Sequence, residues 1–348
     1  MNPSRTLSLL VGAAAIVIMV AGMRSAAGIV APVMLSLSLT ILFHPVRVRL
    51  ERRIPSWAAS VLVLLFAYLL IIVFTLALVV SVGRMADLVA DYEIEAADLT
   101  TTINDWLTDA GMAPDPVDAV AGAMDITRLI DLATSVLSGI LSVLSDLLFL
   151  GTLLLFLAFD SANASRLARG AREHRPHLVD ALGSFAHGTR TYLGVSALFG
   201  LIVAVIDTAV LWAIGIPGAF VWGVLAFVTN FIPNIGFVIG VIPPALIGLL
   251  EGGPGLMITV IVLYSLINMV IQSIIQPRYV GDAVGLSTTL TFLSLIFWTW
   301  VLGPVGALLA VPMTLFFRAI LVEADPAADW MRPLLSGDPD DKTVAEGR

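Results

Sequence analysis

Long apolar stretches are the feature that most limits what this chain can fold into. Several of them run for about 20 residues with almost no charge, which is the length that a helix needs to cross the hydrocarbon core of a bilayer. From residue 191 to 321 the sequence is apolar almost throughout and is interrupted mainly by Gly and Pro. In the whole chain 59% of residues are hydrophobic and 13% are charged, against about 25% charged in soluble domains. We therefore predict an all-α polytopic membrane protein.

Five full membrane spans are predicted along the chain. They cover residues 7–23, 25–43, 56–82, 136–159 and 191–214. The first could also be the apolar core of a signal peptide, but its length and the second span close behind it favour an uncleaved helix. Together with the apolar segments that follow, about eight membrane segments are expected.

The charges between the spans predict which loops face the cytoplasm. Residues 44–55 carry four arginines, residues 160–190 are also basic, and residues 83–135 are strongly acidic. Because short basic loops stay in the cytoplasm, we expect both basic loops and both termini inside. The acidic segment then lies outside, where helical spacing of its apolar residues predicts a small extracytoplasmic helical subdomain.

Residues 191–320 contain a weak internal repeat. Each repeat has a full span, a short connection, and two apolar segments separated by a Gly/Pro break, which is IPNIG at 232–236 and GPVGA at 303–307. Gly and Pro are common in membrane helices. However, broken backbone at membrane depth survives only where protein buries it or where it lines a water-filled cavity. Transporters build substrate and ion sites from such breaks, so the repeated break predicts a functional site.

Each break-containing pair of segments, at 219–250 and 287–320, allows two architectures. A single broken helix would cross the membrane once, whereas a re-entrant hairpin would return to the side that it entered from. At about 1.5 Å per residue each pair is long for one crossing and short for two, which favours half-length hairpins. The break residues are Asn230, Ile232, Pro233, Asn234, Gly236, Pro243, Gly303, Pro304, Gly306 and Pro312.

The predicted organisation has five parts. A three-span region at 1–82 and the acidic segment at 83–135 are followed by the fourth span with its basic loop at 136–190. A duplicated core then occupies 191–322, and a disordered cytoplasmic tail occupies 323–348.

Polar side chains inside the predicted spans are the candidates for transport or ion coupling. Asp207 interrupts the fifth span, and an intramembrane carboxylate usually faces a cavity, a partner or an ion path. It could carry a proton or Na⁺, or it could be a structural hydrogen-bond partner of Asn268 or Gln272. These two amides lie four residues apart on one helix face and could instead hold helices together. Asp146, in the fourth span, is a second ionisable candidate.

The order of these features resembles the AI-2E family of bacterial inner-membrane transporters. Two spans, an arginine-rich loop with ERRIP, a span and an acidic segment are followed by IPNIG, QPRYVGDAVGL and GPVGALLAVP. The resemblance implies secondary transport, since such proteins are described as exporters of autoinducer-2 and some relatives as Na⁺(Li⁺)/H⁺ antiporters. It also implies a homo-oligomer in the cytoplasmic membrane.

Motif positions carried over from this resemblance extend beyond the breaks. They include Gln276, Pro277, Arg278, Gly281, Asp282 and Gly285. Arg278 could pair with Asp282 as a gate, or it could be a topology charge only. Asn234 stands where many relatives carry an aromatic residue, so the resemblance does not transfer a substrate through this position.

The predicted function is a secondary transporter that exports a small, autoinducer-2-like molecule with ion coupling. The alternatives are a Na⁺(Li⁺)/H⁺ antiporter, a passive channel lined by the same breaks, and a membrane scaffold. An enzyme is not expected, because the four histidines fall in predicted loops and no zinc-protease or nucleotide-binding motif occurs. No metal, cofactor or nucleic acid is expected either. The expected partners are membrane lipids, the transported substrate and further copies of the chain.

Overall fold

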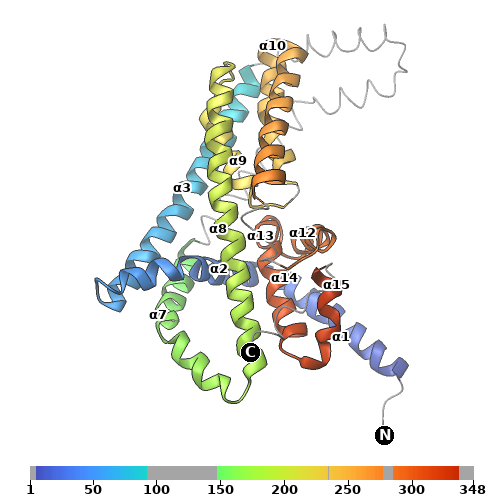
Figure 1. Ribbon diagram of the computed structural model, residues 1–348. Coiled ribbons are helices and arrows are strands. Elements are labelled where there is room, and N and C mark those ends of the chain that lie inside the picture. The colour runs from blue at the N-terminus through green and yellow to red at the C-terminus, as the bar shows by residue number, and fades with distance from the viewer. Residues whose placement is uncertain (1–4, 92–146, 234, 277–284, 337–348) are drawn as a thin grey trace. The chain divides into compact units, whose positions relative to one another are not determined.

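The described part of the chain is helical. A computed structural model describes residues 5–91, 147–233, 235–276 and 285–336, and no strand occurs among them (Figure 1). Within these described ranges, four helical stretches are long and apolar enough to cross a membrane, at Ala27–Leu50, Ser56–Val73, Pro176–Ala213 and Gly236–Gln272. Together with the composition, these helices make the chain a multi-pass membrane protein.

The chain divides into two compact units. Unit 1 comprises residues 1–68, 148–195 and 280–348, and unit 2 comprises residues 69–147 and 196–279. The helices α3 (Ser56–Asp91) and α8 (Pro176–Ala213) each contribute residues to both units. Residues of the predicted duplicated core at 191–322 belong to both units.

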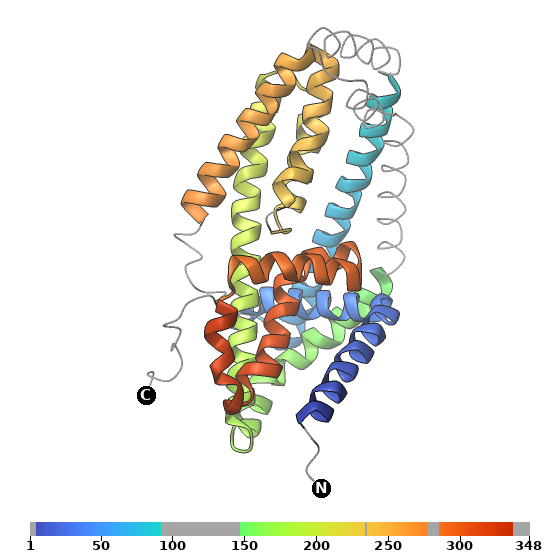
Figure 2. The same cartoon turned by 90° about the vertical axis from the view of Figure 1, so that its right-hand side faces the viewer.

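Unit 2 contains the C-terminal parts of α3 and α8, and α8 is followed by α9, α10 and a π-helical turn. These elements are α9 (Ala219–Thr229), α10 (Gly236–Asn268) and η1 (Met269–Ile275). The chain reverses inside α10 at Gly252 and Gly253, whose backbone angles are non-helical. Figure 2 shows the two halves of α10, in gold and orange, as an antiparallel pair, and Gly248 approaches Val260 across it.

The first half of α10 also pairs with α9, and we call this pair the first hairpin. Its described residues are 219–233 and 235–251, with the tip at 230–233 and 235. At the tip Gly236 packs so closely that an added Cβ would overlap the carbonyl oxygen of Thr229, so only glycine fits there. Further along, Gly240 faces Ala226 and Thr229. The chain thus doubles back at the predicted IPNIG break.

Unit 1 contains a second hairpin with the same kind of tip. It is formed by α12 (Thr288–Leu302), α13 (Pro304–Leu308) and α14 (Ala310–Arg318). The reversal occurs at Gly303, whose φ of 70° favours glycine. An added Cβ on Gly306 would overlap the carbonyl oxygen of Trp298, so α13 packs back onto α12.

The remaining described elements of unit 1 flank this hairpin. They are α1 (Arg5–Ser25), α2 (Ala27–Leu50), the start of α3, α7 (Leu147–Arg172, from Leu148), the N-terminal part of α8, the π-helical turn η2 (Ala319–Glu323), the 3₁₀ turn η3 (Pro326–Met331) and α15 (Arg332–Ser336). A core that includes Phe185, Val311 and Leu315 joins α8 to α14.

Several helices run beyond the apolar stretches from which they were predicted. The basic loop predicted at 44–55 is reduced to a turn at 51–55, because α2 continues to Leu50. Likewise, the loop predicted at 160–190 is helical except for residues 173–175. Hydropathy marks where a chain lies in the bilayer, whereas Arg, Ala and Leu favour helix on either side of that boundary.

Three other predictions are corrected by these elements. The histidines are not all in loops, since His44 lies in α2 and both His177 and His187 lie in α8. The tail predicted as disordered from 323 is helical in η3 and α15, up to Ser336. The acidic segment predicted from residue 83 begins as helix, because α3 continues to Asp91. The rest of the predicted acidic subdomain and the start of the fourth span, at 92–146, lie outside the described residues.

Candidate functional site

A small cavity with a polar lining lies inside unit 2. Its volume is about 10 Å³, which is at the lower limit for one water molecule. The polar residues that line it are Asp207 from α8, Thr229 and Asn230 at the end of α9, Tyr264 and Asn268 from α10, and Gln272 from η1. We call this the site cavity. It brings together three residues singled out from the sequence as transport candidates, Asp207, Asn268 and Gln272.

Asp207 is the ionisable group of the site cavity. Its side chain is 0% exposed, and neither carboxylate oxygen accepts a hydrogen bond from any described residue. The structural alternative, in which Asp207 bonds to Asn268 or Gln272, is therefore wrong for this conformation. Burying a charged carboxylate without a partner is strongly unfavourable. A proton or a cation on Asp207 would remove this cost.

Tyr264 adds a second polar group that lacks a partner. The ring is 1% exposed, and its hydroxyl oxygen is buried without a hydrogen-bond partner among the described residues. Three buried polar atoms, the two carboxylate oxygens and this hydroxyl, thus belong to side chains that line one cavity. Buried polar groups without partners are rare in native proteins and call for an explanation such as a bound ion.

A chain of side-chain amides closes one side of the site cavity. Asn230 Nδ2 donates to the carbonyl oxygen of Ser196 at 2.8 Å, and Asn268 Nδ2 donates to that of Tyr264 at 3.0 Å. Between them, Gln272 Nε2 donates to Asn230 Oδ1 at 2.8 Å and to Asn268 Oδ1 at 2.6 Å. The amides thereby connect the hairpin tip to α8 and to η1.

Small residues allow the helices around the site cavity to approach one another. Asn230 packs directly over Gly200, whose added Cβ would lie 2.8 Å from Asn230 Nδ2. On the same two helices, an added Cβ on Gly223 would overlap the hydroxyl of Thr208 and lie 2.9 Å from the carbonyl oxygen of Ala204. Glycine at these contacts is what brings α9 onto α8, and so brings Asn230 within reach of Gln272.

The break residues have different surroundings at the two hairpins. In the first hairpin, Asn230, Ile232 and Pro233 form the tip, Gly236 begins α10, and Pro243 lies within α10. In the second hairpin, Gly303 forms the tip, Pro304 and Gly306 lie in α13, and Pro312 is buried in α14. Of these nine described residues only Asn230 lines the site cavity. Asn234 lies outside the described residues.

The predicted gate residues and Asp146 receive no structural test. Gln276 ends the described part of the helix after η1 and does not line the site cavity. Residues 277–284, which include Pro277, Arg278, Gly281 and Asp282, lie outside the described residues, as does Asp146. Gly285, at the end of this stretch, accepts a hydrogen bond from Arg318 through its carbonyl oxygen.

Comparison with known proteins supports a transport role for the chain. The family model described as "AI-2E family transporter" matches residues 13–324. The chain belongs to the AI-2E family. It is 31% identical to a putative transport protein of Haemophilus influenzae, over 94% of each chain. It is also 30% identical to the AI-2 transport protein TqsA of Escherichia coli, over 88% of this chain and 89% of TqsA.

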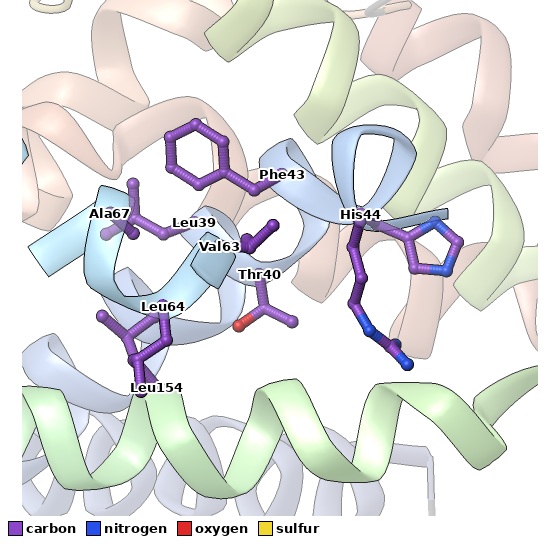
Figure 3. Close-up of a pocket in the computed structure, with 9 residues that line it drawn as sticks. Leu39, Thr40, Phe43, His44, Val63, Leu64, Ala67 and Leu154 are labelled. Atoms are coloured by element: carbon purple, nitrogen blue, oxygen red, sulfur yellow. The ribbon is translucent and has the colours of Figure 1, made fainter. Parts of the chain in front are cut away.

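This AI-2E family chain also holds features that sequence reasoning did not single out. Tyr264 and Thr229 line the site cavity, but an isolated hydroxyl in an apolar helix gives no signal of its own. A second cavity, of about 20 Å³, lies in unit 1 between α2, α3 and α7, and Figure 3 shows Phe43, Val63 and Leu154 around it.

Two polar residues that line this second cavity, Thr40 and Arg47, have hydrogen-bond partners. Arg47, expected as a loop charge, is 2% exposed. It donates to Glu51 at 2.5 Å and to Ser60 at 2.9 Å. The hydroxyl of Thr40 bonds to the carbonyl oxygen of Ser36. The second cavity therefore lacks the unpaired carboxylate that distinguishes the site cavity.

Proposed function

We propose that this protein is an ion-coupled secondary transporter whose coupling group is Asp207. One observation carries the proposal: a fully buried carboxylate, without a hydrogen-bond partner among the described residues, lines a cavity beside a helix break. Membrane proteins retain such groups where an ion or a proton is carried. Binding and release of that ion would change the stability of the buried carboxylate, and so would couple the ion to a conformational change.

We propose a small exported molecule of the autoinducer-2 class as the substrate. TqsA, which the chain matches over most of its length, is named an AI-2 transport protein. Other relatives are named only as putative transport proteins. Membership of the AI-2E family thus supports transport, and the TqsA name supports this cargo as the first to test.

The first hairpin is proposed to be re-entrant. With 11 residues, α9 is about 17 Å long, which is much less than the roughly 30 Å of the hydrocarbon core. Apart from Thr229 at its end, the helix is apolar, so it belongs in the membrane although it cannot cross it. A half-length hairpin would place the Asn230 tip, and the site cavity beside it, at membrane depth.

Na⁺(Li⁺)/H⁺ antiport is a second candidate function. A cavity of about 10 Å³ is far smaller than the roughly 300 Å³ or more of a small-molecule pocket, and it suits a bare ion. The protein would then exchange a cation for a proton at Asp207 without any organic cargo.

The cellular location and the oligomeric state are proposed from the charge pattern and the family resemblance. We propose the bacterial cytoplasmic membrane, both termini in the cytoplasm because of the basic segments at 44–55 and 160–190, and a homo-oligomer as the family resemblance implies. The surrounding lipids are the remaining partner.

A flux screen in proteoliposomes tests the proposal. Purified protein is reconstituted with an imposed pH or Na⁺ gradient, and autoinducer-2 export is compared with Na⁺/H⁺ exchange. We expect gradient-driven flux of one of these substrates, lost in Asp207→Asn and kept in Asp180→Asn, which changes an exposed aspartate on the same helix. Gradient-driven flux that persists in folded Asp207→Asn would contradict the assignment of Asp207. Steeply voltage-dependent, uncoupled conductance would indicate a channel instead.

A further inference from the structure

We propose that the side-chain amide of Gln272 occupies a monovalent cation site, and that the coupling cation binds by displacing it. The site consists of Asn230 Oδ1, Asn268 Oδ1 and the Asp207 carboxylate. This inference rests on the proposed function. It gives the class of the coupling ion, and it identifies Gln272 as the side chain that competes with this ion for the site.

The orientation of the amide chain follows from its two ends. Asn230 and Asn268 each point one amide atom at a backbone carbonyl, that of Ser196 and that of Tyr264. Because a carbonyl only accepts, these atoms must be the nitrogens, and both Oδ1 atoms must face Gln272. The Gln272 atom between them must then be a donor, so its NH₂ group is the one that lies there.

Two oxygens therefore converge on one partly positive group. The separations of 2.8 Å and 2.6 Å from Gln272 Nε2 are hydrogen-bond distances, so both oxygens direct a lone pair at the same NH₂ group. Na⁺ sites in transporters are built from neutral oxygens at broken helices, and the tip of the first hairpin supplies one of these two oxygens. The NH₂ group thus takes the place of a cation between them.

The charge of the site favours a monovalent ion. Asp207 lines the same cavity, fully buried and without a hydrogen-bond partner among the described residues. One carboxylate balances one positive charge, whereas a divalent ion would leave an uncompensated buried charge. In the described ranges no group of three or more His, Cys, Asp or Glu side chains could hold a metal ion, which agrees with a site made mainly of neutral oxygens.

The position of Gln272 allows its side chain to be displaced from the site. It is only partly buried and lies in η1, where the amide of Gln276 bonds to the carbonyl of Ile271, five residues back. Such π-helical turns are rare and frequently mark functional sites. Asn230 and Asn268, in contrast, are each tied to a backbone carbonyl. A cation would therefore displace the glutamine and leave the two asparagine oxygens in place.

Cation-dependent thermal stability tests the proposal without any transport assay. The full chain, purified in detergent, is heated in NaCl or LiCl against choline chloride at constant ionic strength. A ligand that binds only the folded state raises the unfolding temperature as its concentration exceeds the dissociation constant. The variants are Gln272→Ala, Gln272→Met as a near-isosteric alternative that also lacks the donor, and Thr259→Ala as an exposed control on α10.

We expect Na⁺ or Li⁺ to stabilise the wild type and Thr259→Ala equally. Either Gln272 variant lacks the two hydrogen bonds to Asn230 and Asn268 that compete with the cation. The half-saturating concentration of Na⁺ or Li⁺ should therefore be about tenfold lower in these variants. Asp207→Asn should abolish the stabilisation.

Two results would overturn the proposal. Either no stabilisation by Na⁺ or Li⁺ appears in the wild type and the Gln272 variants, or the half-saturating concentration stays the same or rises in those variants. An unchanged concentration would mean that Gln272 has no role in cation binding, and a higher one would mean that Gln272 itself coordinates the cation. Neither result depends on flux. If this test fails, the flux screen still shows whether the protein is a proton-coupled transporter without this cation site or does not transport at all.

Discussion

The two hairpins share a backbone plan but differ in how their polar groups are satisfied. In the second hairpin, Trp298 Nε1 donates to Thr314 Oγ1 at 3.0 Å, and this hydroxyl lies 2.8 Å from both Ser294 Oγ and the Ala310 carbonyl oxygen. Beside the first hairpin, Asp207 and Tyr264 have no such partners among the described residues. A Gly/Pro break of the same kind thus lies beside hydrogen-bonded polar side chains in unit 1 and beside a cavity with unpaired polar atoms in unit 2.

This difference separates structural from functional roles. A saturated cluster contributes to stability and has no free acceptor for a ligand, whereas an unsatisfied buried carboxylate lowers stability and persists where function needs it. Changes to the polar groups of the second hairpin should therefore affect folding, and changes to the site cavity should affect transport. The predictions below test this separation.

Arg318→Met should have the largest effect on stability. Arg318 pairs with Glu323 at 2.8 Å, and both side chains are 13% exposed. Removing one partner of a buried ion pair costs about 3–5 kcal/mol, because the other charge stays buried alone. Denaturant unfolding in mixed micelles measures the free energy of unfolding.

The exposed pair of Arg172 and Asp180, with side chains 62% and 47% exposed, provides the matched control. Arg172→Met should cost no more than about 1 kcal/mol. Transport per folded molecule should stay at the wild-type rate in Arg318→Met. A loss of transport without a loss of stability would place Arg318 in the transport machinery.

Alanine at the two hairpin tips should have an intermediate effect. In Gly236→Ala and Gly306→Ala the new methyl group overlaps the carbonyl oxygen of Thr229 or Trp298, and overpacking of this kind costs about 1–3 kcal/mol. Gly255→Ala and Gly183→Ala are controls with open space around the added Cβ, and they should be neutral or slightly stabilising.

Transport of the folded fraction distinguishes the two tips. Gly236→Ala should reduce it, since the methyl group disturbs the tip that carries Asn230, and Gly306→Ala should not. Equal transport losses in the two variants would remove the functional distinction between the hairpins.

Thr314→Val should have the smallest effect. The substitution keeps the shape of the side chain and leaves Trp298 Nε1 without its acceptor, which costs about 1 kcal/mol. The unfolding free energy should fall by that amount, with an unchanged half-saturating substrate concentration in flux assays. A shift in that concentration would show that the second hairpin contacts the substrate.

The sequence predicts the local features of this fold better than the long-range ones. The breaks at IPNIG and GPVGA coincide with the two tips, because Gly and Pro act on the backbone where they stand. The contact between Asn268 and Gln272 follows from their spacing of four on a helix.

The partners of these groups could not be read from the sequence. Asn230 and Gln272 are 42 residues apart, and they meet because Gly200 and Gly223 let α9 approach α8. The division between the units at residues 279 and 280 also depends on packing, and it cuts across the repeat seen in the sequence. Helix ends that lie beyond the predicted apolar stretches, such as Leu50, cannot be read from hydropathy.

The most direct test of the central claim is the initial rate of export from proteoliposomes with an ion gradient imposed and with the same gradient collapsed. The wild type, Thr314→Val and Asp207→Asn are compared at equal amounts of folded protein. We predict that the gradient accelerates export in the wild type and in Thr314→Val, and that it has no effect in Asp207→Asn. Gradient-accelerated export in Asp207→Asn would contradict the account.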